Sequence, residues 1–312
     1  MRIATFEIDG ASRLGLVVGE EADGIIDMTA ALETARVERN GASEDMLGLI
    51  RSWNADFAKL IEEAARGQRR LVRAQTKLRA PLERPGKLIC LAGNYREHIV
   101  ESGYEAPLES DVITQQLFLK PATAIIGDRD EIVISENNVT VGWETELAII
   151  IGKRGRRIPA RAALDHVFGY TILNDISERG LNSRIENRRK RELDRFFDWL
   201  AGKWFDGFAP SGPWIVTADE IGDPHNLNIR LWVNDQLRQE GNTRDMIFGI
   251  EDQIAYSSSI MTLEPGDIIS TGTPVGAGIG GDASLQAGDE LVCEIEKIGT
   301  LRNRVTVERQ AQ

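Results

Sequence analysis

The sequence predicts an α+β protein that is mainly β, with a small N-terminal α/β module (residues 1–80) and a larger β-rich domain (residues 81–312). Three features support this fold class. Short β-branched runs bounded by Gly, Pro, Asn or Asp recur from residue 87 onward. Helical patterns concentrate in the first quarter of the chain, and a stretch with two prolines separates the two regions. The length of 312 residues is enough for one large domain or two smaller ones.

The N-terminal module combines strands and helices. Residues 1–29 are predicted to form short strands joined by turns. Residues 30–78 are predicted to be helical, because apolar residues recur at helical spacing in MLGLIRSW and FAKLIEEAARG. The segment RAPLERPGK, residues 79–87, is predicted to be a linker.

The second domain is predicted to consist mainly of short strands. Helical segments are expected near residues 160–166, 181–201 and 246–261. The predicted strands are KLICLAG, QLFLKP, AIIGD, EIVI, TELAIIIG, FGYTILND, GPWIVT, NIRLWVN, DIISTG and ELVCEIE.

Composition and charge exclude several classes of function. The net charge is −12, from 37 basic and 49 acidic residues, which argues against nucleic acid and anionic membranes as partners. Cys90 and Cys293 lie in different regions, so neither a disulfide framework nor a zinc cluster is indicated. The N-terminus has no apolar signal core and no run approaches a membrane span, so we expect a cytoplasmic protein.

Two carboxylates interrupt the apolar run VGWETELAIII, residues 141–151. Glu144 and Glu146 are two residues apart and therefore share one face of a strand. Adjacent buried carboxylates repel each other unless a cation lies between them. Asp175, at the predicted end of another strand, supplies a third acid. Three carboxylates without Cys or His indicate a hard cation: Mg²⁺ fits best, Mn²⁺ next, and Ca²⁺ is compatible. The alternative is an edge strand with two exposed glutamates.

A second candidate site lies in LICLAGNYREHIVESG, residues 88–103. His98 and Glu101 are three residues apart and would be neighbours on one helical turn. A carboxylate beside an imidazole orients the ring, which suits a general base that acts on water. The alternative is a surface histidine in a helical ion pair. His166 and His225 have no acid at this spacing and are predicted to be structural or surface residues.

Six blocks of sequence, in order, resemble the fumarylacetoacetate hydrolase (FAH) family in its bacterial acylpyruvase-like branch. The resemblance runs from about Lys87 to Ile298 and implies an FAH-type mixed β-sandwich roll as the catalytic domain. Family members are commonly homodimers, so we expect a homodimer through the β-rich domain. The blocks are GNYREH with Glu101, FLKP, WETELAIIIGK, GYTILNDIS, GKWFDGFAPSGPWI and STGTPVGAG.

The resemblance implies a role for each matching position. It makes Glu144, Glu146 and Asp175 the ligands of a divalent metal, and His98 with Glu101 the water-activating dyad on a segment that forms a short lid helix in relatives. It adds Lys203 as a catalytic cation close to the metal and the oxoacid. It implies substrate contacts or support of the site for Tyr95, Lys120, Arg179, Asn182 and Thr273.

Each of these additional positions also has a purely structural interpretation. Lys203 and Arg179 could form surface ion pairs, which is the common use of cations in an acidic protein. Thr273 could close a turn in a segment rich in turn-forming residues. Lys120 could support the site without touching the substrate.

The implied activity is that of a metal-dependent hydrolase acting on C–C bonds in ketonic substances. The substrate class is an acylpyruvate-type 2,4-dioxo acid, such as fumarylpyruvate or acetylpyruvate, as used in aromatic catabolism. His98 and Glu101 would activate water, and the metal and Lys203 would stabilise the enolate that forms on the 2-oxo acid fragment. Two alternatives remain. The first is that the same site decarboxylates oxaloacetate, or isomerises or dehydrates a 2-oxo acid. The second is a non-catalytic metal-binding protein.

The chain departs from the family pattern between residues 178 and 208. It has Glu178-Arg179-Gly180 where the family often has Ala-Arg-Asp, and Asn182 in place of a longer polar side chain. The segment NSRIENRRKRELDRFFDWLAGKWFDGF is longer than in many relatives and is predicted to be helical across residues 184–200. It would be either a solvated helix packed by Phe196, Phe197 and Trp199 or a wall of the substrate pocket. These departures concern the identity of the substrate more than the chemistry.

Overall fold

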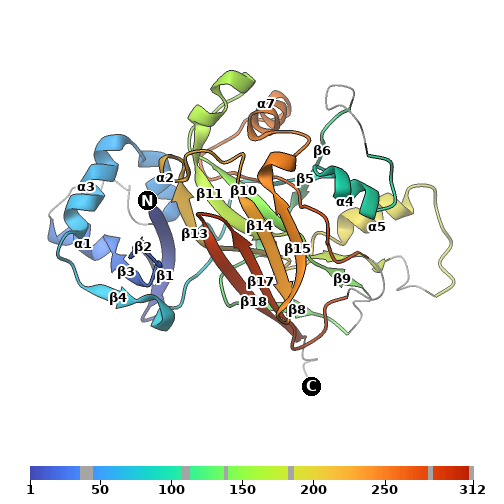
Figure 1. Cartoon of the computed structure of the whole chain (residues 1–312), viewed down its shortest axis with the longest axis horizontal. Helices are drawn as coiled ribbons and strands as arrows, with labels where there is room; N and C mark the ends of the chain where they lie inside the picture. Colours follow the sequence, from blue (N-terminus) through green and yellow to red (C-terminus); the bar gives the residue numbers. More distant parts are fainter. Residues whose placement is uncertain (36–44, 107–112, 137–139, 182–185, 280–283, 309–312) are drawn as a thin grey trace.

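The computed structural model describes residues 1–35, 45–106, 113–136, 140–181, 186–279 and 284–308. Its architecture is mixed α/β and mainly β, as the sequence predicts (Figure 1). An eleven-stranded sheet and a five-stranded sheet dominate the described residues. The helices within residues 28–65 lie beside the N-terminal strands at the left of the view, and those at residues 96–101 and 194–201 lie at the right (Figure 1).

The N-terminal residues form four strands and three helices. Asp27, Asp45 and Asn54 start the helices, because their side chains accept hydrogen bonds from amides of the first turn. The prediction that residues 30–78 are helical is wrong at residues 70–72, which pair with another strand and extend the sheet. The elements are β1 (Arg2–Ile8), β2 (Ala11–Val18), β3 (Gly24–Asp27), α1 (Met28–Thr34), α2 (Met46–Ser52), α3 (Ala55–Ala65) and β4 (Arg70–Val72).

The large sheet has the strand order β4-β3-β2-β1-β13-β11-β10-β16-β5-β6, with β7 beside β13. Because β1 pairs antiparallel with β13, the N-terminal strands and the strands of the second region belong to one continuous sheet. All seven residues of β10 are buried, which explains its apolar sequence. The remaining strands of this sheet are β5 (Leu88–Ala92), β6 (Gln116–Lys120), β7 (Ile125–Ile126), β10 (Thr145–Ile151), β11 (Val167–Asn174), β13 (Ala209–Thr217) and β16 (Ile268–Ser270).

The five-stranded sheet has the order β15-β14-β17-β18-β8, and its buried residues share one core with the large sheet. Its strands are β8 (Glu131–Ile134), β14 (Asn228–Val233), β15 (Gln236–Asn242), β17 (Glu290–Ile295) and β18 (Gly299–Val307). The strands β15 and β18 are not among those that the sequence predicts. Both contain several exposed polar residues, so neither forms a continuous apolar run. A short pair, β9 (Val141–Gly142) and β12 (Ser177–Glu178), lies beside the carboxylate cluster.

The helical predictions for the second region are confirmed only in part. The helix expected near residues 246–261 is present, whereas residues 160–166 form two 3₁₀ turns. Of the helix predicted across 184–200, residues 184 and 185 lie outside the described residues, and in the rest of the segment the helix begins at Asp194. The Asp194 carboxylate accepts a hydrogen bond from the Arg191 amide at 2.9 Å in the preceding turn. The helices are α4 (Arg96–Glu101), α5 (Asp194–Ala201), α6 (Ala218–Ile221) and α7 (Ile250–Ile260), with 3₁₀ turns at Arg73–Gln75, Ala122–Ala124, Ala160–Ala162, Leu164–His166 and Thr243–Asp245.

Among the described residues, no helix combines the length and the apolar character needed to cross a membrane. The segment predicted to be a linker, residues 79–87, contacts β1 at its start and continues through bends at residues 81–84 and 86. The Arg79 amide donates to the Thr5 carbonyl, and the Thr5 hydroxyl donates to the Pro81 carbonyl.

Candidate active site

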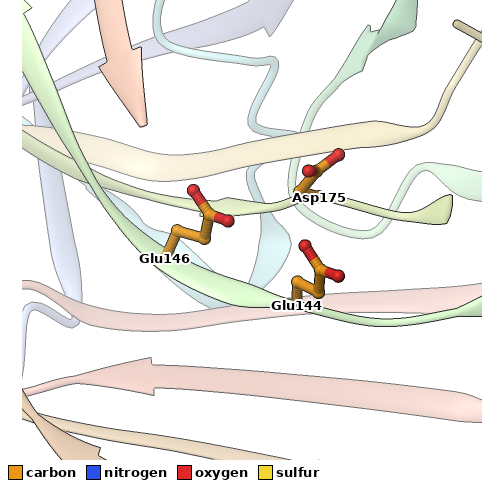
Figure 2. A group of neighbouring side chains, drawn as sticks. All are labelled: Glu144, Glu146 and Asp175. Atoms are coloured by element: carbon orange, nitrogen blue, oxygen red, sulfur yellow. The ribbon is translucent and has the colours of Figure 1, made fainter. Parts of the chain in front are cut away.

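Three carboxylates converge where β10 begins and β11 ends. The two strands are antiparallel, and Thr145 pairs with Asn174, which places Asp175 beside Glu144. Ligand oxygens of Glu144, Glu146 and Asp175 all lie within 4.8 Å of one another, and Figure 2 shows the carboxylates turned toward a common space. All three residues are buried. The prediction of a shared face is confirmed, and the exposed edge-strand alternative is wrong because β10 lies between β11 and β16.

Three cations pair with two of these carboxylates. The Lys203 ammonium donates to Glu144 at 2.9 Å and to Asp175 at 2.6 Å. The Lys120 ammonium donates to Asp175 at 2.5 Å, and the Arg179 guanidinium pairs with Glu144. Lys120 and Lys203 are buried, so the interpretation of Lys203 as a surface ion-pair residue is wrong.

The charges set the pKa values of the two glutamates in opposite directions. Burial alone would raise the pKa of Glu144, but the Lys203 ammonium and the Arg179 guanidinium outweigh it and hold that pKa well below its usual range. Burial, followed by the negative charges of Asp175 and Glu144, raises the pKa of Glu146 to about 8. One Glu146 oxygen accepts from the Ser270 hydroxyl at 2.5 Å. No cation among the described residues pairs with Glu146.

The residues present fit a hard divalent cation. The donor set consists of carboxylate oxygens from two adjoining strands, which is the chemistry that Mg²⁺ and Mn²⁺ prefer. Glu146 carries a buried carboxyl whose pKa is raised by burial and by the charges of Asp175 and Glu144, and no cation among the described residues forms an ion pair with it. A divalent ion held by Glu144, Glu146 and Asp175 would supply that charge.

The predicted dyad lies on α4, close to the carboxylates. His98 Nδ1 is 3.4 Å from a Glu101 oxygen, and the Gly276 amide donates to both Glu101 oxygens at 3.1 Å. His98 is buried, so the interpretation as a surface histidine is wrong. His98 lies within electrostatic range of the Glu144 carboxylate, so the ring is near the carboxylate cluster. Because Nδ1 faces Glu101, Nε2 is the nitrogen that can take a proton from water.

Two of the other predicted substrate contacts, Thr273 and Tyr95, differ in whether their hydroxyl groups have hydrogen-bond partners among the described residues. The Thr273 hydroxyl donates to the Thr145 carbonyl at 2.9 Å and accepts from the Gln239 amide at 2.8 Å. The Tyr95 hydroxyl is buried without a hydrogen-bond partner among the described residues, and burial raises its pKa. Asn182 lies outside the described residues.

The two remaining histidines lie outside this site, as the sequence predicts. His166 Nδ1 is 2.9 Å from the Lys153 carbonyl oxygen. His225 lies between two acids, with its Nε2 2.8 Å from Glu251 and its Nδ1 3.2 Å from Asp223. Both contacts involve partially exposed residues, which is typical of surface histidines.

Aromatic rings from β6 and α5 surround Lys203. Its ammonium lies 5.2 Å from the Phe118 ring and 5.8 Å from the Trp199 ring. These contacts favour α5 as a wall of the site. The alternative was a solvated helix packed by Phe196, Phe197 and Trp199. Trp199 does pack, with its ring centroid 5.2 Å from that of Phe118, whereas Phe196 and Phe197 are about half exposed, at 53% and 52%.

Three residues that the sequence analysis did not assign support the site. Asn174 accepts from the Glu144 amide at 2.9 Å, and Ser270 donates to Glu146. Both stand in the family-like blocks GYTILNDIS and STGTPVGAG, so the sequence contained a signal for them. Gln239, which contacts Thr145 and Thr273, stands in none of these blocks.

Metal binding is expected to release about one proton per ion near pH 7. Glu146, with its pKa of about 8, is mostly protonated at that pH, and the metal requires the carboxylate. The apparent affinity for Mn²⁺ should therefore rise by about tenfold per pH unit up to about pH 8 and then level off. Calorimetry in buffers of different ionisation enthalpy measures the proton release. A pH-independent affinity between pH 6 and pH 8 would contradict the assignment.

Known proteins share both the sequence and the fold. A family model described as Fumarylacetoacetate (FAA) hydrolase C-terminal matches residues 87–306. The mitochondrial oxaloacetate tautomerase FAHD2A from Homo sapiens is 41% identical over 237 residues, which cover 75% of this chain and 71% of that protein.

Two solved structures each align with 99% of the chain. Maleylpyruvate hydrolase from Sphingobium sp. SYK-6, in complex with manganese(II) and pyruvate, is 35% identical with a TM-score of 0.77, covering 99% of this chain and 100% of that one. Fumarylacetoacetate hydrolase from Exiguobacterium antarcticum is 32% identical with a TM-score of 0.78 and the same coverage. The chain, with its divalent-metal site at Glu144, Glu146 and Asp175, therefore belongs to the fumarylacetoacetate hydrolase family of metal-dependent enzymes.

Proposed function

We propose that this enzyme hydrolyses a C–C bond in acylpyruvate-type 2,4-dioxo acids, as a member of the acylpyruvase-like branch. The observation that carries the proposal is the His98–Glu101 dyad: His98 is buried, its Nδ1 lies 3.4 Å from a Glu101 oxygen, and the Gly276 amide donates to the Glu101 carboxylate. A histidine in this arrangement is suited to take a proton from water. The maleylpyruvate hydrolase that aligns with 99% of the chain supports the same reaction class.

The charge balance of the site suits an anionic substrate. Three carboxylates are offset by the cations Lys120, Lys203 and Arg179. A divalent ion at the carboxylates would act as a Lewis acid on the 2-oxo carboxylate end of the substrate. The site then has an excess of positive charge, which matches a 2-oxo acid that develops an enolate.

The chain's own residues account for the proton transfers. Glu101 orients the His98 ring, and His98 Nε2 takes a proton from a water molecule that attacks the carbonyl at C4. The bond between C3 and C4 breaks, and its electron pair remains on the pyruvate fragment as an enolate. Lys203 and Arg179 stabilise that negative charge, and His98 returns its proton to C3 of the enolate, which gives pyruvate and a second carboxylic acid and restores the neutral ring.

A second candidate is the tautomerisation of oxaloacetate. It is favoured by the 41% identity with the human oxaloacetate tautomerase FAHD2A. The same residues would serve, because His98 can move a proton between carbon and oxygen without a water nucleophile. Decarboxylation of oxaloacetate would use the same enolate.

Assays with Mg²⁺ or Mn²⁺ and several substrates separate these reactions. The substrates are acetylpyruvate, fumarylpyruvate, maleylpyruvate and oxaloacetate. We expect pyruvate and the matching acid in equal amounts from one of the three acylpyruvates. Faster interconversion of enol and keto oxaloacetate, without cleavage of any acylpyruvate, would replace hydrolysis with tautomerisation. Carbon dioxide from oxaloacetate would identify a decarboxylase.

A further inference from the structure

Gln239 is a fully buried amide on β15 that uses its whole side chain for hydrogen bonds with other elements. Its oxygen accepts from the Thr145 amide at 2.9 Å. Its nitrogen donates to the Thr273 hydroxyl at 2.8 Å and to the Pro274 carbonyl at 2.9 Å. The orientation of the side chain is fixed, because a backbone amide can only donate and a carbonyl can only accept.

These contacts join the two halves of the active site. Thr145 stands between the metal ligands Glu144 and Glu146 on β10. The other half is the loop of residues 271–278, here called the Thr273 loop. Its Gly272 amide donates to Glu146 at 3.0 Å, and its Gly276 amide holds Glu101 of the dyad.

The backbone of the Thr273 loop lies directly against β15. Gly276 has a positive φ of +89°, and a Cβ atom there would lie 1.9 Å from the Arg238 carbonyl oxygen. Glycine is therefore required at this close approach. A shift of Gln239 would move the loop, since no side chain separates this part of the loop from the strand.

We infer that Gln239 is a positioning residue. It fixes the position of the Thr273 loop, which holds Glu101 of the dyad, relative to β10, which carries the metal ligands. It touches neither the metal ligands' carboxylates nor the dyad, and it acts through Thr145 and Thr273. The expected effect of Gln239 on catalysis rests on the proposed function. Its effect on metal binding is independent of the substrate.

The test compares Gln239→Met with a matched control, Asn303→Leu. Asn303 is another buried amide of the five-stranded sheet, and its nitrogen donates to the carbonyls of Gly127 and Asp130 at 2.9 Å, outside the active site. Both variants remove a buried amide of similar shape, so both should lower the Tm. Only Gln239→Met should weaken Mn²⁺ binding, measured by electron paramagnetic resonance, and lower kcat, each by about tenfold or more.

The positioning role is supported if Gln239→Met loses more Mn²⁺ affinity or more kcat than Asn303→Leu does. It is overturned if the two variants have the same Mn²⁺ affinity and the same kcat. If Gln239→Met does not fold, Gln239→Asn is measured in the same way, because its amide is one methylene too short to span Thr145 and Thr273. If the wild-type enzyme turns over no acylpyruvate, the proposed function fails, and Mn²⁺ affinity alone decides the role of Gln239.

Discussion

His98→Ala is expected to lower kcat for acylpyruvate hydrolysis by about 10²- to 10⁴-fold, the usual contribution of a positioned general base. The dissociation constant for Mn²⁺ should remain within about threefold of wild type, because His98 is not among the carboxylates that hold the ion. Steady-state kinetics on acetylpyruvate or fumarylpyruvate, together with Mn²⁺ titration, measures both quantities.

His225→Ala is a matched control for this variant. His225 is also paired with an acid, Glu251, but it lies outside the active site. Its replacement should leave kcat unchanged. Glu101→Gln should also lower kcat, but by a smaller factor than His98→Ala, since Glu101 orients the base without taking the proton itself. Full turnover by His98→Ala would remove the base assignment.

Glu146→Ala is expected to weaken Mn²⁺ binding by more than about a hundredfold. Replacing a residue that only hydrogen-bonds to a metal ligand typically lowers metal affinity by about 10- to 100-fold, and the loss of a ligand itself should cost more. Activity should fall with it at any practical metal concentration. The folded apoprotein should persist: above pH 4.5 the raised pKa of Glu146 makes its buried carboxyl a cost to folding, and the substitution removes that cost. Calorimetry and the metal-induced rise in Tm measure the loss of binding.

Asp267→Ala is the matched control for the loss of a buried carboxylate. Asp267 lies immediately before β16 and pairs with Lys87 at 2.6 Å instead of facing the cluster. Its replacement should lower the Tm, because it leaves the partly buried Lys87 ammonium without its ion-pair partner, and it should leave Mn²⁺ affinity unchanged. Unchanged Mn²⁺ affinity in Glu146→Ala would contradict the ligand role of Glu146.

The local features of the site follow from the sequence. Glu144 and Glu146 share a face because side chains alternate along a strand, whatever the strand packs against. His98 and Glu101 meet because residues three apart adjoin on a helical turn. Tertiary contacts were needed to decide between the functional and surface interpretations of His98 and Lys203, because the local sequence does not show whether a side chain is buried. The boundary at residue 80 stays a prediction.

The sequence by itself determined the mainly β fold class, the paired glutamates and the histidine–acid pair, because each depends on the local period of a strand or helix. Only the tertiary structure decided which distant groups meet them. Lys120 and Lys203 reach the carboxylates from separate elements, and Gln239 reaches Thr145 from a strand of the other sheet. Such contacts arise from strand order and sheet packing, which join residues far apart in the chain and leave no periodic pattern in the sequence.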